Sequence, residues 1–269
     1  MAEEDETYDE FLNGYVIEES SDKCREECAR CNRPARTCLC SYLPAKPIET
    51  SVKIRILQHP REPSYFCTYT YTTISKKQQK RRLTTVPILT AALAKDSVHV
   101  YRGIRFTRNR LTELAEIASS PSTAILYPSS QAIDIKQLSC QELKVTNLFV
   151  IDGTWNEART IMHRNEFLKR CIQVKLVDDE ISKFVIRTQP NVTCVSTIEA
   201  VALSLEILEN DHHIKEALLK PLRAMCDMQL ACGAVVHHSK DVVKKMLMDP
   251  SSNACKETSS EYDGANRKV

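Results

Sequence analysis

The chain has 269 residues, of which 42% are apolar and 27% charged, which is an ordinary composition for a soluble globular protein. Its longest apolar runs, such as residues 148–151, are far shorter than the roughly 20 residues of a membrane-spanning helix. The acidic first ten residues lack the apolar segment of a secretory signal. We therefore expect a cytoplasmic protein, with the nucleus as an additional location, no membrane segment and no obligate protein partner.

The formal net charge of +2 is unevenly distributed along the chain. Residues 1–27 hold 11 acidic and 2 basic residues, which leaves 24 acidic and 35 basic residues in the rest of the chain. A basic excess of this size suits an anionic partner, with nucleic acid as the leading candidate. A solubilising surface charge beside a disordered acidic tail explains the same numbers, so charge alone leaves both interpretations open.

Glycine is scarce, with five residues in the whole chain. No G-x-G-x-x-G and no G-x-x-x-x-G-K-[ST] motif occurs. These are the turns that cradle phosphates in dinucleotide-binding folds and in P-loop enzymes, so both classes are excluded.

Strand-like and helix-like segments alternate along the globular part of the chain. Residues 52–57 alternate apolar and charged side chains, as a half-buried strand does, and residues 148–151 form a continuous apolar run typical of a strand buried on both faces. The remaining expected elements are a helix at 86–94, a strand at 98–104, a helix at 111–118, a strand at 124–127, a helix at 155–169, a strand at 173–177, an apolar run at 192–195 and a helix at 197–209. This alternation predicts an α/β fold with a mainly parallel sheet, whose ligands lie beyond the carboxyl ends of the strands.

Two strand-to-helix junctions carry polar residues in a pattern with chemical meaning. Thr154 and Glu157 fit a capping box, and Ser196 and Glu199 repeat it at the second junction. Well-capped helices explain those four residues. They do not explain Asp152, an acid at the carboxyl end of an apolar strand, which is therefore our candidate catalytic residue.

Five of the 12 cysteines fall between residues 24 and 40. Four thiolates spaced C-x2-C-x6-C-x-C can close a tetrahedral zinc site with no open position, which predicts a structural Zn²⁺. The predicted ligands are Cys28, Cys31, Cys38 and Cys40. Cys24 could replace one of them, and four reduced cysteines in a flexible segment are the alternative.

An ordered set of motifs resembles the DTW-domain family. The residues DGTW at 152–155 carry its signature, and CARCNRPARTCLC at 28–40 resembles its cysteine motif. The other matching motifs also occur in the family's order along the chain: Leu57-Gln58-His59-Pro60 with Glu62 and Leu126-Tyr127-Pro128 before the signature, and Val185-Ile186-Arg187 with Gln189-Pro190 and Ser196-Thr197-Ile198-Glu199-Ala200 after it. In place of the family's short connection after Glu62, residues 63–81 form an insertion before Arg82.

The resemblance implies a SPOUT-like α/β fold with a knotted C-terminal part. It implies transfer of the 3-amino-3-carboxypropyl group of S-adenosylmethionine to the ring nitrogen of a uridine in the D-loop of tRNA, with release of methylthioadenosine. The implied organisation is a disordered acidic tail at 1–22, a zinc-binding Cys-rich knuckle at 23–44, a catalytic domain at 45–238 and a polar tail at 239–269.

The same resemblance implies which residues form the site. Residues His59, Arg82 and Arg187 are candidates for contact with the substrates. The residues expected to bind the donor are Leu126, Tyr127, Pro128, Asp152, Gly153, Thr154, Trp155, Ser196, Thr197 and Glu199. Asp152 is expected to act as general base, with the donor's ammonium group as an alternative partner.

Two other functions remain open at this stage. A SPOUT-type RNA methyltransferase would use the same donor and release adenosylhomocysteine. A non-catalytic RNA-binding module built on the zinc knuckle would bind no donor at all.

Overall fold

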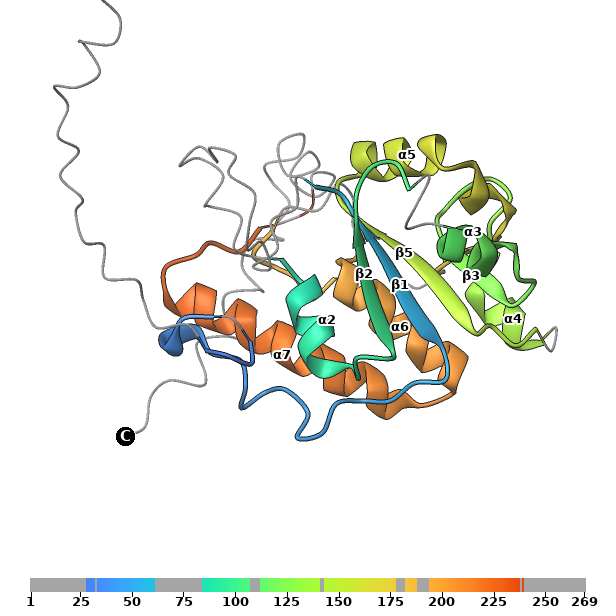
Figure 1. Cartoon of the computed structure of the whole chain (residues 1–269). Helices are drawn as coiled ribbons and strands as arrows, with labels where there is room; N and C mark the ends of the chain where they lie inside the picture. The colour runs from blue at the N-terminus through green and yellow to red at the C-terminus, as the bar shows by residue number, and fades with distance from the viewer. Residues whose placement is uncertain are drawn as a thin grey trace, which may run out of the picture.

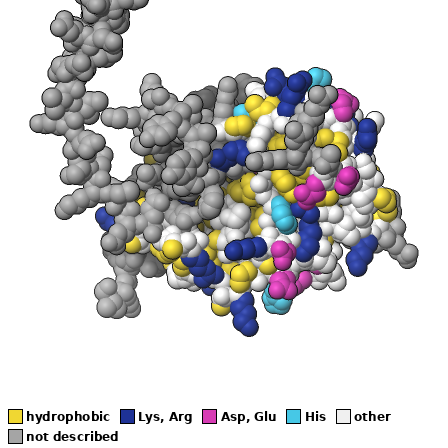
Figure 2. Space-filling view, in the orientation of Figure 1, with side chains coloured by type: hydrophobic (Ala, Val, Ile, Leu, Met, Phe, Trp, Pro, Cys, Tyr) yellow, Lys and Arg dark blue, Asp and Glu magenta, His cyan; other side chains and the backbone are white. Residues whose placement is uncertain are grey.

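A computed structural model describes residues 28–31, 33–60, 84–106, 112–140, 143–177, 182–187, 194–237 and 239. The predicted tail at 1–22, the insertion at 63–81, and the tail at 239–269 apart from its first residue lie outside this description. No helix among the described residues combines the length and the apolar character needed to cross a bilayer. The face in Figure 2 carries both signs of charge, interspersed with apolar side chains.

A six-stranded sheet, parallel throughout, forms the centre of the protein in the order β2-β1-β5-β3-β6-β4 (Figure 1). The predicted α/β class with a mainly parallel sheet is confirmed. The strands are β1 (Lys53–Gln58), β2 (Val98–Arg102), β3 (Thr123–Leu126), β4 (Ile133–Asp134), β5 (Asn147–Asp152) and β6 (Ile172–Lys175). The predicted knot depends on connections outside the described residues and stays a prediction.

Alternating side chains of the strands build two hydrophobic cores, one on each face of the sheet. Ile54, Leu148 and Val150 point to one face, while Leu57 and Phe149 point to the other. Phe149 is fully buried and packs edge-on against Phe167 on the second face. This two-sided burial explains why residues 148–151 form an uninterrupted apolar run.

Helices cover both faces of the sheet (Figure 1). The first face packs against α2 (Val86–Ala92), α4 (Ile135–Cys140), α6 (Thr197–Glu209) and α7 (His212–Ala231). The second face packs against α3 (Thr112–Ser119), α5 (Trp155–Arg164) and the 3-10 helix η3 (Glu166–Arg170). A short 3-10 helix, η1 (Ala35–Thr37), lies within the cysteine-rich segment.

Strands β1 and β5 lie side by side, and the chain leaves them in opposite directions. After β1 it passes through α2 to β2 at one edge of the sheet, and after β5 it passes through α5 to β6 towards the other edge. Parallel sheets form a crevice at such a switch point, beyond the carboxyl ends of the two strands. The final residues of these strands, Gln58 and Asp152, are register partners there.

The longest helix of the described chain, α7, is absent from the expectations drawn from the sequence. It spans 20 residues, begins after Asp211, whose carboxylate accepts from the amide of His213, and continues through Pro221. Its buried residues Ile214, Leu218 and Leu222 recur every four positions and pack against α6 and the first face. The short elements β4 and α4 were not predicted either.

The helix predicted at 155–169 is interrupted at Asn165, where it divides into α5 and η3. The Asn165 side chain is fully buried and donates to the carbonyls of Ile161 at 2.6 Å and Ile104 at 2.9 Å. Its Oδ1 accepts from the amide of Phe106 at 2.7 Å. These bonds compete with the helical pattern and tie the helix end to the segment after β2.

We predict that Asn165→Ala destabilises the fold, because it leaves the buried amide of Phe106 and the carbonyl of Ile161 unpaired. Each unpaired buried group costs about 1–3 kcal/mol. Urea unfolding should show the loss. Asn165→Asp should also be less stable than wild type, because its buried carboxylate would face the carbonyl oxygens of Ile161 and Ile104. Asn156→Ala, at an exposed position of α5, is the control. Equal stability of Asn165→Ala and Asn156→Ala would contradict this role.

Candidate active site and metal centre

Asp152 lies at the β1/β5 switch point with its carboxylate held by two elements. The residue is 8% exposed and continues the row of Leu148 and Val150, so its side chain faces α6. Oδ2 accepts from Nε2 of Gln58 at 2.9 Å, and Oδ1 accepts from the hydroxyl of Thr197 at 2.6 Å. Each oxygen keeps a further lone pair with which it can accept another hydrogen bond.

Gln58 is fully buried and is itself oriented by a cation. The Arg102 guanidinium donates to Oε1 of Gln58 at 3.2 Å. A guanidinium only donates, so the Gln58 oxygen must face Arg102 and its NH2 group must face Asp152. A chain of hydrogen bonds therefore runs from the end of β2, through β1, to the carboxylate at the end of β5.

The start of α6 forms the second wall of this arrangement. Ser196 and Glu199 form the predicted capping box, which aims the first turn of α6 at Asp152. Glu199 is 3% exposed and accepts from the hydroxyl of Ser182 and the amides of Lys183 and Ser196, at 2.8, 2.6 and 2.7 Å. Several donors of this kind are what a buried carboxylate requires. Glu199 thus fixes the 182–187 segment to α6 and supports the first turn of α6, whose Thr197 bonds to Asp152.

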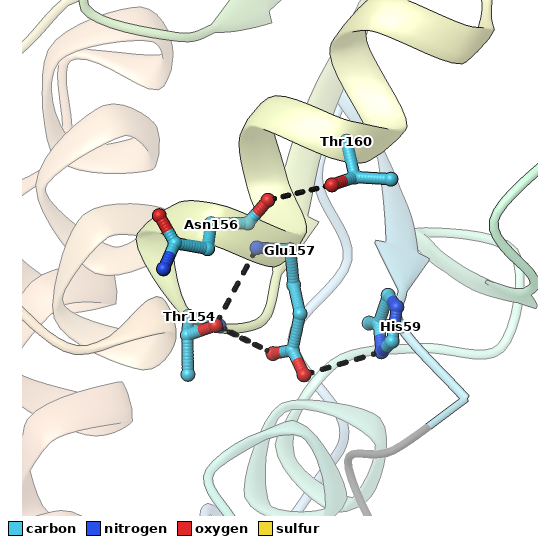
Figure 3. A network of polar contacts seen from close by, with 5 residues as sticks. All are labelled: His59, Thr154, Asn156, Glu157 and Thr160. Carbon is cyan, nitrogen blue, oxygen red and sulfur yellow. Dashed lines mark hydrogen bonds and ion pairs between the residues drawn. The ribbon is translucent and has the colours of Figure 1, made fainter.

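The predicted capping box at the start of α5 is also present (Figure 3). Oε2 of Glu157 accepts from the amide and the hydroxyl of Thr154 at 2.8 and 2.9 Å. A side chain at Gly153 would place its Cβ 3.2 Å from the Cβ of Glu157 and 3.4 Å from the Cβ of His59. Glycine therefore lets α5 and the residue after β1 approach the turn closely, and a side chain here would have to push them apart by a few tenths of an ångström.

His59 follows β1 directly and supports the same turn. Its amide donates to the carbonyl of Asp152 at 3.0 Å, and its Nδ1 lies 3.4 Å from Oε1 of Glu157 (Figure 3). The His59 side chain is only 6% exposed. It therefore bridges β1, β5 and the start of α5, which places it beneath the turn that follows Asp152.

The other predicted site residues occupy different positions relative to Asp152. Leu126 ends β3, beside β5, and the amide of Tyr127 continues the sheet by donating to Val174 of β6. Pro128 and Arg187 are exposed. The remaining predicted contact, Arg82, lies outside the described residues.

Gln58 and Arg102 hold Asp152, yet neither was among the site residues expected from the sequence. Gln58 was seen only as one letter of a motif, and Arg102 belonged to no motif. The available signal was a polar residue at the carboxyl end of an otherwise apolar strand, the same signal that singled out Asp152. Arg102 carries no such signal, because its contact depends on the pairing of β1 with β2.

The four predicted metal ligands come together. The sulfur atoms of Cys28, Cys31, Cys38 and Cys40 all lie within 4.8 Å of one another. Cys28 and Cys40 are 3.4 Å apart, and Cys31 and Cys38 are 3.7 Å apart. A tetrahedron with Zn–S bonds of about 2.3 Å separates its sulfurs by about 3.8 Å, so the cluster fits Zn²⁺. Cys24, the alternative ligand, lies outside the described residues.

The surroundings of the thiols differ. Backbone amides, those of Cys31 and Arg30, lower the pKa of Cys28 to about 6. Burial and the neighbouring sulfurs raise the pKa of Cys40 to about 12, and burial also raises the pKa of Cys31. Zinc binds thiolates, so filling this cluster must displace protons from the two thiols with raised pKa.

The cysteine knuckle packs on α7, the last helix among the described residues. Cys31, Leu39 and Leu43 are buried in the core of the first face, which α7 also lines. The Arg33 guanidinium lies 2.9 Å from the sulfur of Met225 in α7. A metal at this position would hold the N-terminal segment against α7, which is a structural role.

We predict that one Zn²⁺ binds per chain and stabilises it. A strong chelator should lower the Tm of the metal-loaded protein by about 10 °C or more, since each kcal/mol lost shifts Tm by about 2–4 °C in a chain of this size. Cys38→Ser should lower both the zinc content, measured by atomic emission, and the Tm. Cys232→Ser, at an exposed cysteine outside the cluster, should change neither. Full zinc content in Cys38→Ser would contradict the assignment.

Comparison with known proteins agrees with the motifs. The model of the DTW domain matches residues 25–230. The chain is 37% identical to "tRNA-uridine aminocarboxypropyltransferase 2" of Mus musculus over 247 residues, which is 91% of this chain and 77% of that protein. The Drosophila melanogaster protein of the same name is 37% identical over 222 residues, or 82% of each chain.

A plant relative is more distant. "tRNA-uridine aminocarboxypropyltransferase A" of Arabidopsis thaliana is 30% identical over 233 residues, which cover 76% of this chain and 81% of that protein. No solved structure matches the chain. The domain match extends from the cysteine knuckle into α7 and so includes the parallel sheet and the Asp152 site. The chain belongs to the DTW-domain family.

Proposed function

We propose that this protein is a tRNA-uridine aminocarboxypropyltransferase that uses S-adenosylmethionine as its donor. The observation that supports the proposal most strongly is its 30–37% identity, over most of the chain, to proteins named for this activity. The buried carboxylate at the switch point of a parallel sheet adds a site of the right kind, since such crevices bind small ligands.

The reaction requires one bond to form and one to break. The ring nitrogen of uracil attacks the γ-carbon of the donor's aminocarboxypropyl arm, and the bond between that carbon and the sulfonium sulfur breaks. Its electron pair returns to sulfur, so methylthioadenosine leaves as a neutral thioether. The uracil nitrogen must lose its proton, which gives the protein two tasks: presenting the correct carbon and receiving the proton.

Asp152 is the residue we assign to the second task. Gln58 and Thr197 fix its carboxylate, and its low exposure excludes most of the water that would otherwise solvate it. A carboxylate whose position is fixed needs no rearrangement when the uracil arrives. A general base of this kind typically contributes 10²–10⁴-fold to a rate. The alternative assignment is that the same carboxylate holds the ammonium group of the donor.

The donor would lie along the carboxyl ends of β3 and β5 and against the start of α6. Tyr127, Gly153 and Thr197 border this region from three elements. Arg187, which is exposed, would pair with the donor's carboxylate or with a tRNA phosphate through its bidentate guanidinium. The target uridine must be unstacked to reach the crevice, which a loop such as the D-loop permits at lower cost than a helix.

The direct test is incubation of the protein with unmodified tRNA and S-adenosylmethionine. Nucleoside mass spectrometry should detect 3-(3-amino-3-carboxypropyl)uridine, and the by-product should be methylthioadenosine. Formation of adenosylhomocysteine and a methylated nucleoside would instead identify a methyltransferase. Absence of donor binding by calorimetry would identify a non-catalytic RNA-binding module.

We predict that Asp152→Asn lowers kcat by about 10²–10⁴-fold while the Kd for the donor changes little. The amide keeps the size of the side chain but cannot receive the proton. If Asp152 instead holds the ammonium group, the Kd for the donor should rise, and calorimetry separates the two outcomes. Asp96→Ala, in the exposed turn before β2 at the opposite end of the sheet, is the control and should match wild type.

A further inference from the structure

Helix α5 begins at the active-site turn and presents an outer face of unusual composition. The residues of α5 that are exposed are Trp155, Asn156, Arg159, His163 and Arg164. Its one acidic residue, Glu157, turns inwards to Thr154 and His59. The exposed face therefore combines one aromatic ring, one amide and three basic or imidazole groups, with no carboxylate.

The order of these residues along the helix is regular. Trp155, Arg159 and His163 are four residues apart and so form one row on the surface, which extends about 12 Å from the active-site turn at 1.5 Å per residue. Asn156 and Arg164 belong to the adjacent row, and Oδ1 of Asn156 accepts from Arg159 at 2.6 Å. That bond uses one of five donors of the guanidinium and steadies its position.

Basic residues continue beyond the end of α5. In η3, Lys169 and Arg170 are exposed. The ammonium nitrogen of Lys169 forms an ion pair with Oε1 of Glu166 at 2.6 Å. Figure 2 shows Lys, Arg and His side chains together at the top of the molecule, over α5. Arg170 thus adds a positive charge beyond α5, separated from it by the exposed Glu166–Lys169 pair.

Trp155 is the feature that a purely electrostatic surface does not explain. It is 45% exposed, although a single tryptophan is usually mostly buried in a globular domain. It follows Asp152 by three residues and stands where the turn opens to solvent. A flat apolar ring beside positive side chains is the combination that single-stranded nucleic acid recognises, with bases stacking and phosphates pairing.

We propose that the outer face of α5 is the docking surface for the substrate RNA. Trp155 stacks on a nucleotide next to the target uridine, and Arg159, His163 and Arg164 contact the phosphates that follow it. This inference rests on the proposed function for the identity of the RNA. The expectation that Trp155 binds the donor is the alternative that the following test decides.

The test uses two variants of the full-length protein that should respond differently to salt. Binding of an unmodified tRNA transcript is measured by fluorescence anisotropy at several salt concentrations. The double variant Arg159→Ala/Arg164→Ala should reduce the slope of log K against log salt by about 1.4–1.8, since each phosphate contact contributes about 0.7–0.9. Trp155→Ala should weaken binding about 5- to 150-fold without changing the slope, and Trp155→Phe should restore most of the loss.

A matched control removes the same charge from the other face of the sheet. Lys220 and Arg223 are exposed on α7. Lys220→Ala/Arg223→Ala should leave the slope and the affinity for tRNA unchanged, and circular dichroism should show that all variants are folded. The donor's Kd should be the same in every variant. A lower donor affinity in Trp155→Ala, with unchanged tRNA binding, would overturn the proposal and return Trp155 to the donor pocket.

Failure of this inference can be told apart from failure of the proposed function. If wild type forms the modified nucleoside but the α5 variants keep the wild-type salt slope and tRNA affinity, the docking surface is wrong and the activity stands. If wild type forms no product, the binding measurements still decide whether α5 contacts RNA.

Discussion

The hydrogen bonds of one carboxylate connect the parts of this protein that must act together. Asp152 ends the central strand β5, and its two oxygens join it to Gln58 of β1 and to Thr197 at the start of α6. Arg102 extends the connection to β2. The orientation of each group follows from the chemistry of the next, because a guanidinium on one side and a carboxylate on the other leave the Gln58 amide only one orientation. The polar groups at the switch point are therefore held in place by the protein's own hydrogen bonds.

A second set of polar contacts, made by two glutamates, supports the surroundings of Asp152. Glu157 and Glu199 each accept from the first turn of a helix, and each also reaches another segment, His59 in one case and residues 182–183 in the other. Each of these glutamates thus caps a helix and holds a neighbouring segment with the same carboxylate. The two helices whose first turns border the site cannot shift without breaking the contacts that hold the neighbouring loops.

The features predicted correctly from the sequence are those whose residue pattern lies within a short stretch of chain. The apolar run of β5, the alternation of β1, both capping boxes and the four metal ligands depend on residues close together in the chain. Two features that the sequence did not reveal depend on contacts between distant segments. Arg102 meets Gln58 only when β1 is paired with β2, and the break at Asn165 depends on the segment after β2. Gln58 and α7, in contrast, carried local signals that the expectations did not use: a polar residue at the carboxyl end of a strand, and an apolar residue every four positions.

The packing of the cysteine knuckle on α7 has a consequence for the order of events during synthesis. The four cysteines are close together in the sequence, so an ion could bind them as soon as that stretch has left the ribosome. Helix α7, on which the knuckle packs, is synthesised much later, since Arg33 and Met225 are 192 residues apart. A metal bound at these cysteines would therefore hold the knuckle together before the helix on which it packs has been synthesised.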